Sequence, residues 1–262
     1  MRRALAAAVA LLAAIPLAGC TRPSAVGSVE RASTAALSGT ITVDAAASLS
    51  TVFPKLGRAF EAAHPGVDVR FDFGGSSDLA AAIVAGAPID VFAAASAATM
   101  KTVTEAKLAA AAPVPIAQNK LEIVVPSDNP GRVTGIQDFG DAKRTIVICA
   151  PTVPCGAAAQ QVFALAHVTA KPDSLEQSVT GVLTKVRLGE ADAGLVYITD
   201  VRAAGSAVIG IPFREADEAI TDVLIAPLRH ASKPALAKAF TDYVREHGHG
   251  ELDAAGFLAP KR

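Results

Sequence analysis

The sequence predicts an α/β protein built from two blocks of alternating strands and helices, each with a mainly parallel sheet. Three observations support this fold class. Short β-branched or aromatic runs alternate with apolar residues at helical spacing along most of the 262-residue chain. The alternation divides into one block before about Ala117 and another after about Asn119. Serines and glycines collect where the predicted strands end, which is where such sheets bind ligands.

The first block begins with a strand from Thr40 to Ala45, which contains Ile41 and Val43. Ser48 is predicted to cap the helix that follows, with Pro54 loosening or kinking its first turn. The other elements predicted in this block are a strand at 67–73, a helix through Leu79 and Ile83 that ends near Gly86, a strand at 89–94 and a helix at 100–108.

The second block continues the alternation towards the C-terminus. Its predicted strands are 121–125, 145–149, 194–197, 208–211 and 223–226. Its predicted helical segments are a short one at 136–139, then 157–166, 179–188 and 232–244, the last capped by Ser232. A chain of this length can form one large domain or two small lobes.

The N-terminal segment predicts export. Arg2 and Arg3 precede an apolar run that is shorter than the about 20 residues needed to span a bilayer. The run ends in Leu17-Ala18-Gly19-Cys20, so residues 1–19 are predicted to be a signal peptide. This ending resembles the lipobox of bacterial lipoproteins, which implies a lipid anchor on Cys20. Residues 20–39 would then be the anchor and a flexible tether. The alternative is an ordinary signal peptide cleaved elsewhere.

Charge and cysteine content restrict the function further. The net charge is −1 without a basic block, whereas nucleic-acid binding requires a positive surface. Cys149 and Cys155 are predicted to form a disulfide, because the exported side of a membrane permits one. Two free thiols are the alternative. A metal site is not expected, since two cysteines without a nearby histidine or carboxylate are an incomplete ligand set.

Several motifs combine small residues, a hydroxyl and the start of a helix. Ala45 to Leu49 and Gly74 to Leu79 both have this form. A helix N-terminus presents unpaired N–H groups and a partial positive charge, so an anion can bind there. Val153 to Gly156, Ser178 to Gly181 and Tyr197 offer further donors from the second block. A single motif of this kind is more simply explained as a turn and helix cap, but together the motifs predict a ligand held between two lobes.

The ligand predicted by these motifs is an oxyanion. An oxyanion that is fully ionised at neutral pH has only acceptor atoms, so it suits a site of hydroxyl and backbone donors without a carboxylate. Phosphate is partly protonated and benefits from an acceptor. Asp44 and Asp78 lie near the motifs and could serve as acceptors. We expect instead that Asp44 is solvated and that Asp78 caps its helix.

The motifs together resemble those of the molybdate-binding proteins of ABC importers. The resemblance runs in order over nearly all of the mature chain, and it rests on VDAAASL (43–49), FGGSSDL (73–79), GAPIDVF (86–92), VPCG (153–156), ADAGLVYITD (191–200) and Gly256-Phe257. It implies a class II periplasmic-binding-protein fold, in which two lobes are joined by a two-segment hinge. Lobe 1 would comprise residues 40–117 and 227–262, and lobe 2 residues 118–226. The hinge would lie near 117–121 and 222–227.

The resemblance also implies a site. Ser48 and Ser76 would supply hydroxyl and backbone N–H groups, Cys155 and Val179 backbone N–H groups, and Tyr197 its phenol hydroxyl. These donors would hold molybdate or tungstate through its oxygens, without direct metal ligands and without a cofactor. The implied partner is an ABC-transporter permease. The protein is expected to be a monomer outside the cell, anchored to the outer face of the cytoplasmic membrane.

Two positions depart from the family pattern. Position 155 is often Ala in relatives, whereas this chain has Cys there. Position 44 is often apolar in relatives, whereas this chain has Asp. Two alternatives remain open on the sequence. One is a protein of the same fold for sulfate or phosphate. The other, a secreted hydrolase, is disfavoured because the serine motifs lack G-x-S-x-G and contain no histidine. We therefore expect no enzymatic activity.

Overall fold

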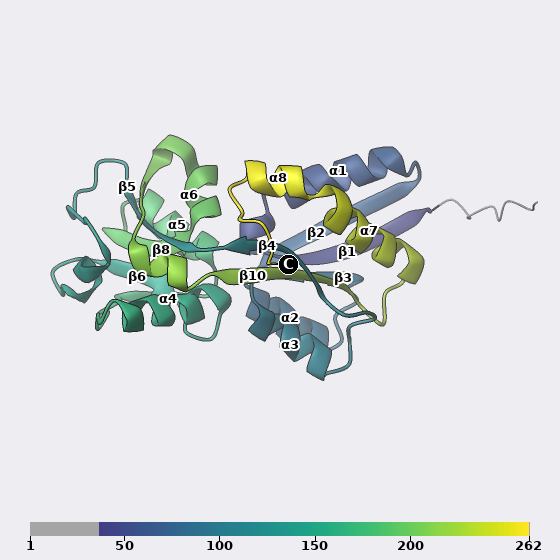
Figure 1. The fold of residues 1–262 in the computed structure, drawn as a ribbon, viewed down its shortest axis with the longest axis horizontal. Coiled ribbons are helices and arrows are strands. Elements are labelled where there is room, and N and C mark those ends of the chain that lie inside the picture. Colours follow the sequence, from purple (N-terminus) through teal and green to yellow (C-terminus); the bar gives the residue numbers. More distant parts are fainter. Residues whose placement is uncertain (1–36, 262) are drawn as a thin grey trace, which may run out of the picture. The chain divides into compact units, whose positions relative to one another are not determined.

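The strands of the protein form two five-stranded sheets, as Figure 1 shows for the computed structural model, which describes residues 37–261. The strand order is β2-β1-β3-β10-β4 in the first sheet and β7-β6-β8-β5-β9 in the second. The predicted signal peptide, Cys20 and all but the last three residues of the predicted tether lie outside the described residues. The α/β fold class predicted from the sequence is confirmed.

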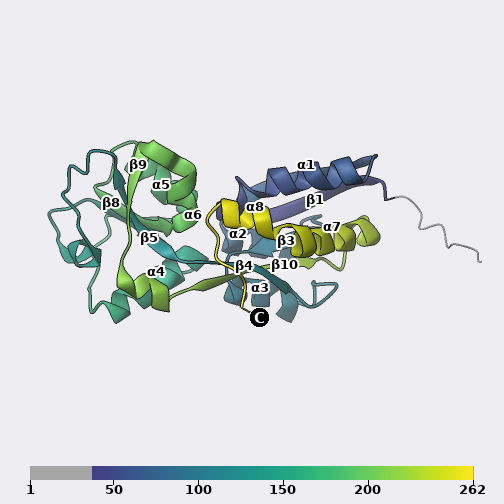
Figure 2. The same ribbon diagram turned by 45° about the horizontal axis from the view of Figure 1, so that its top comes forward.

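Helices cover both faces of the first sheet (Figures 1 and 2). Its strands are β1 (Gly39–Ala46), β2 (Val67–Gly74), β3 (Val91–Ala94), β4 (Val114–Asn119) and β10 (Thr221–Pro227). On one face lie α1 (Phe53–Ala63), α7 (Pro234–His247) and α8 (His249–Ala254), and on the other lie α2 (Ser76–Val84) and α3 (Ala97–Glu105).

The second sheet is covered in the same way (Figure 1). Its strands are β5 (Leu121–Pro126), β6 (Ile146–Cys149), β7 (Ser174–Glu176), β8 (Ala193–Tyr197) and β9 (Val208–Ile211). Its helices are α4 (Pro154–Leu165) on one face, and α5 (Val179–Arg187) and α6 (Ile198–Ala204) on the other. Short 3₁₀ turns complete the fold at η1 (Ala47–Leu49), η2 (Ile136–Gly140), η3 (Gly205–Ala207) and η4 (Arg214–Glu218). Among the described residues, no helix is both long and apolar enough to cross a membrane.

Both sheets are mixed. Strands β1, β2 and β3 are parallel, as are β6, β7 and β8, whereas β5 and β10 run antiparallel to their neighbours. The antiparallel strands are those next to the passages between the sheets. Strand β4 leads through Lys120 into β5, and β10 returns beside β4, with Thr221 opposite Asn119. The segments predicted as a hinge lie in these strands, and the lobe boundaries remain a proposal.

The helix predicted to follow Ser48 starts later than expected. Residues 47–49 form the turn η1, and α1 begins at Phe53 with Pro54 in its first turn. Proline suits this position, because it has no N–H group and the first amides of a helix have no intrahelical partner. The prediction that Ser48 caps a helix is therefore wrong, and its hydroxyl has no hydrogen-bond partner among the described residues.

Ser232 also has a different role from the predicted one. Helix α7 begins at Pro234 without a side-chain cap. The backbone N–H and the hydroxyl of Ser232 donate instead to Oδ1 of Asp90, at 2.5 and 2.9 Å. The other oxygen of Asp90 accepts from the N–H of Thr42 at 2.7 Å. Asp90 therefore connects β1 with the segment before α7, and the prediction that Ser232 is a helix cap is wrong.

Asp44 is buried rather than solvated, contrary to the sequence-based expectation. It lies in β1 between Asp72 of β2 and Phe92 of β3, and only 3% of its surface is exposed. One carboxyl oxygen, Oδ1, has no hydrogen-bond partner in residues 37–261. Burial, assisted by the charge of Asp72, raises the pKa of Asp44 to about 6. The ionised carboxylate therefore destabilises the folded state.

Replacing Asp44 tests this destabilisation. The folded-state pKa lies above the unfolded value, so the folded state binds the proton more tightly and loses stability as the pH rises from about 4 to about 6. Asp44→Asn should therefore raise the free energy of unfolding at pH 7.5, by up to about 3 kcal/mol, and should lose this advantage below about pH 4. Urea unfolding at several pH values measures the difference. Asp128→Asn, at an exposed position, is the control. A gain in the free energy of unfolding that is the same at every pH would contradict the explanation.

Candidate functional site

A small cavity lies where elements of the two sheets meet. Its volume is about 20 Å³, and a single water molecule already needs about 10–15 Å³ by the same measure. The cavity is thus too small for a sugar or a peptide. The lining residues are Ala46, Ala47, Ser48, Gly74, Gly75, Ser76, Ala95, Val153, Pro154, Cys155, Gln177, Ser178, Val179 and Tyr197.

All five residues proposed from the sequence as oxyanion ligands line this one cavity. Two come from the first block, at η1 and at the start of α2, and three come from α4, α5 and the end of β8. Within the part of the chain that the structure describes, no Lys, Arg, Asp or Glu lines the cavity. Any charge on a ligand would therefore be met by hydroxyl groups, backbone N–H groups and helix dipoles.

The two serines offer hydroxyl donors in different ways. Ser48 is 5% exposed, and its Oγ has no hydrogen-bond partner among residues 37–261. Ser76 Oγ accepts a hydrogen bond from the N–H of Ala95 at 3.1 Å. This bond uses the oxygen of Ser76 as acceptor, so its hydroxyl hydrogen remains available to a ligand. Both side chains are buried, and an unmet donor in such a position is costly.

Tyr197 places a phenol hydroxyl at the end of β8. The side chain is 2% exposed, and burial raises the pKa of the phenol far above its ordinary value, so the group stays protonated and can donate. The nearby hydroxyl of Thr221 lowers the pKa of the phenol in part. This hydroxyl donates to the carbonyl oxygen of Asn119 at 3.3 Å rather than to Tyr197, so Tyr197 Oη has no hydrogen-bond partner in the described part of the chain.

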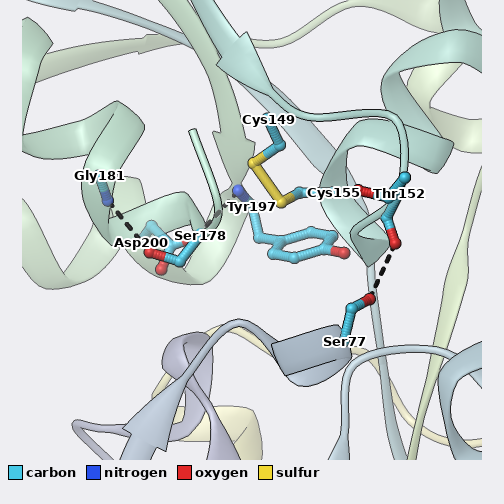
Figure 3. Close-up of a disulfide and its surroundings, with 8 residues drawn as sticks. All are labelled: Ser77, Cys149, Thr152, Cys155, Ser178, Gly181, Tyr197 and Asp200. Carbon is cyan, nitrogen blue, oxygen red and sulfur yellow. Dashed lines mark hydrogen bonds between the residues drawn. A yellow bond between two sulfur atoms is a disulfide. The ribbon is translucent and has the colours of Figure 1, made fainter. Parts of the chain in front are cut away.

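The backbone of Tyr197 is fixed by Asp200. Its N–H donates to Oδ2 of Asp200 at 2.9 Å, which closes the first turn of α6 (Figure 3). Burial raises the pKa of Asp200 to about 7, and this hydrogen bond opposes the shift. Asp200 therefore holds the strand end that carries the phenol.

Three helices begin at the cavity. The first N–H groups of a helix have no intrahelical partner, and the backbone hydrogen bonds of residues 37–261 leave those of Ser76, Cys155 and Val179 unused. Helices α2 and α4 also lack a side-chain cap, whereas Ser178 caps α5 by accepting from the N–H of Gly181 at 3.3 Å. The resulting positive ends of three helix dipoles favour an anion in the cavity.

The two halves approach each other closely beside the cavity. A Cβ atom on Gly75 would lie 2.2 Å from the carbonyl oxygen of Gln177, so glycine is required for this contact. Ser77 Oγ donates to the carbonyl oxygen of Thr152 at 2.8 Å (Figure 3). These contacts connect the start of α2 with two loops of the second sheet.

Cys149 and Cys155 form a disulfide in the structure, with their Cα atoms 5.7 Å apart. It joins the end of β6 to the first turn of α4, and Cys155 lines the cavity. Figure 3 shows the disulfide together with the ring of Tyr197. Within the described residues, no group of three or more His, Cys, Asp or Glu side chains could hold a metal ion.

Some lining residues were not identified from the sequence. Gln177 lies in an exposed loop, where no periodicity or motif distinguishes it. Ala95 acts through its backbone, which any residue type could provide. Conversely, neither Asp44 nor Asp78 lines the cavity. Asp78 lies in the first turn of α2, but the predicted cap is wrong, since no side chain caps this helix.

Comparisons with known proteins agree with this geometry. The family model for bacterial extracellular solute-binding proteins matches residues 41–258. The molybdate-binding protein ModA of Mycobacterium tuberculosis is 41% identical over 221 residues, which cover 84% of this chain and 85% of that protein. The periplasmic molybdate-binding protein of Azotobacter vinelandii, at 21% identity, superposes with a TM-score of 0.67 and covers 84% of this chain and 100% of that one.

The fold alone does not define a ligand. The sulfate-binding protein SubI from Mycobacterium tuberculosis superposes with a TM-score of 0.69 at 16% identity, covering 84% of this chain and 86% of that chain. Likenesses at such low identity establish the two-lobed fold only. The family match, in contrast, spans nearly the whole described chain. The chain therefore belongs to the family of bacterial extracellular solute-binding proteins.

Proposed function

We propose that this protein captures molybdate, and tungstate equally, and delivers it to an ABC-type permease. The observation that carries the proposal is the small cavity, which is lined by hydroxyl and N–H donors and by no charged side chain. The 41% identity to a molybdate-binding protein over most of both chains supports the same ligand.

The donor set fits a fully ionised oxyanion. Ser48, Ser76 and Tyr197 supply hydroxyl hydrogens, and Cys155 and Val179 supply backbone N–H groups. A dianion such as molybdate has only acceptor atoms, so each of its oxygens can accept from these groups. Partly protonated phosphate also needs an acceptor, and the nearby carboxylates of Asp44 and Asp78 do not line the cavity. The cavity thus favours molybdate over phosphate.

Capture and delivery follow from the position of the donors. Ligand donors come from both lobes, so only a closed form makes all the contacts, and the anion shifts an open–closed equilibrium towards closure. The closed form then binds the permease. We further propose that the protein acts as a monomer and that Cys20 carries a lipid that anchors it to the outer face of the cytoplasmic membrane.

A sulfate-binding function is the second candidate. The superposition on a sulfate-binding protein shows that this fold can serve sulfate. Sulfate has the same charge and shape as molybdate and is smaller, so discrimination depends on the cavity dimensions.

Calorimetric titration distinguishes these candidates. The purified protein is titrated at one pH with molybdate, tungstate, sulfate and phosphate. We expect one-to-one binding of molybdate and tungstate. Phosphate should bind much more weakly, because it needs an acceptor and no carboxylate lines the cavity, and sulfate should bind more weakly as the smaller anion. Tighter binding of sulfate would establish the second candidate, and binding of none of the four would refute an oxyanion function.

Single substitutions test the donor set. Ser76→Ala and Tyr197→Phe each remove one hydroxyl donor and should weaken molybdate binding by about 1–3 kcal/mol, roughly 5-fold to 150-fold in Kd. The matched controls are Ser96→Ala, which removes the cap of α3, and Tyr243→Phe, whose ring packs on Phe60. Neither control residue lines the cavity, so their Kd values should not change. Parent-like affinity of both cavity variants would refute the proposed ligand set.

A further inference from the structure

We propose that the Cys149–Cys155 disulfide is a positioning element for lobe closure, which slows release of the bound oxyanion. It would do so by fixing the loop of residues 149–155, which carries both a ligand donor and a contact between the lobes. This inference rests on the proposed function, because its effect is measured on a bound anion. The argument starts from how the loop is built.

The loop is fixed at both of its ends. Cys149 ends β6, and the N–H of Ala150 donates to the carbonyl oxygen of Glu176 at 2.8 Å. The N–H of Val153 donates back to the carbonyl oxygen of Ala150 at 3.1 Å, so the chain turns sharply between them. The start of α4 then packs directly on this turn. A Cβ atom on Gly156 would lie only 1.8 Å from the carbonyl oxygen of Ala150.

Two functional groups lie within this short loop. One is the N–H of Cys155, which belongs to the first turn of α4 and has no partner in the described hydrogen bonds. The other is the carbonyl oxygen of Thr152, which accepts from Ser77 of the opposite lobe at 2.8 Å. Thr152 is itself exposed, and its N–H makes none of the backbone hydrogen bonds of the described residues. The position of its carbonyl therefore depends on the turn between Ala150 and Val153 and on the disulfide that closes the loop.

The disulfide acts on closure because it limits the conformations of this loop. Without it, residues 150–154 sample more conformations, and the closed form must restrict them again. Part of the free energy of the contact between Thr152 and Ser77 is then spent on ordering the loop. The closed, ligand-bound form should open more readily. In related complexes most such effects are on dissociation rather than association.

The side chain at position 155 is free to change. Its proposed ligand contact is the backbone N–H, which any residue except proline retains. Cys149→Ala/Cys155→Ala thus removes the disulfide and keeps this donor. Neither sulfur is part of the cross-lobe hydrogen bond, so the variant separates the effect of the disulfide from the loss of a contact group.

A double-mutant cycle in molybdate binding tests the proposal. The four proteins are the parent, Ser77→Ala, Cys149→Ala/Cys155→Ala and the triple variant. Stopped-flow dissociation should be several-fold faster, up to about tenfold, for Ser77→Ala and for the double alanine variant, with association nearly unchanged. The triple variant should dissociate only slightly faster than the double alanine variant, because without the disulfide the Thr152 carbonyl is no longer fixed in position to accept from Ser77. Ser127→Ala, an exposed serine of the second lobe, is the control and should behave as the parent.

The outcomes separate this inference from the proposed function. Effects on dissociation that multiply independently in the triple variant, or a double alanine variant that releases molybdate at the parent rate, would overturn the positioning role while leaving molybdate binding intact. A parent protein that binds neither molybdate nor tungstate would overturn the proposed function, and this inference with it. Thermal unfolding without ligand shows whether the double alanine variant folds. If it does not fold, the dissociation rates of the parent and of Ser77→Ala are compared before and after phosphine reduction of the disulfide. After reduction, Ser77→Ala should no longer accelerate dissociation.

Discussion

The candidate site depends on a set of buried hydrogen-bond donors that have no partner within residues 37–261. The hydroxyls of Ser48 and Tyr197 have no partner among the described residues, and three helices direct unused N–H groups at the same cavity. Each such group costs about 1–3 kcal/mol when it is desolvated without a partner. The fold accepts this cost because the rest of both lobes is well packed. In the proposed function, a small anion in the cavity would remove this cost and bring the lobes together, so affinity and closure would have a common origin.

The crossing proposed as the hinge lies beside the candidate site. The side chain of Asn119, the last residue of β4, donates to the hydroxyl of Thr199 at 2.9 Å, and the N–H of Ile198 donates to the carbonyl oxygen of Lys120 at 3.0 Å. These two hydrogen bonds connect the crossing between the sheets to the first turn of α6, which follows Tyr197. In the proposed closure, a rotation of one lobe about this crossing would move the phenol with it. The position of the proposed ligand donor and the angle between the lobes would then be linked.

Sequence reasoning predicted most of the elements, and its errors share a physical cause. Alternation was sufficient for β2 and helical spacing for α5, because each pattern reflects burial on one face, whereas β1 is buried on both faces and was predicted from its β-branched residues. The serines were harder to interpret, because a hydroxyl next to a helix start can cap it, bind a ligand or pair elsewhere. Ser48 and Ser232 were both expected to be caps, yet Ser48 is left unpaired and Ser232 pairs with Asp90, a partner distant in sequence. Strand β7 has only three residues, too few for a pattern. The burial of Asp44 arises from tertiary packing that no local signal records.

Among residues 37–261 no charged side chain lines the cavity, and this has a consequence for transport. Binding of a dianion makes the net charge of any protein more negative by about two units unless protons are taken up, whether or not cations line the site. Here no arginine or lysine lies beside the ligand, so the charge of a bound dianion is not paired locally and adds to the field of a protein that is already slightly acidic. The loaded and empty forms therefore migrate differently in an electric field and have different isoelectric points. A membrane receptor with a complementary field could tell them apart by electrostatics alone, before any change of shape is sensed.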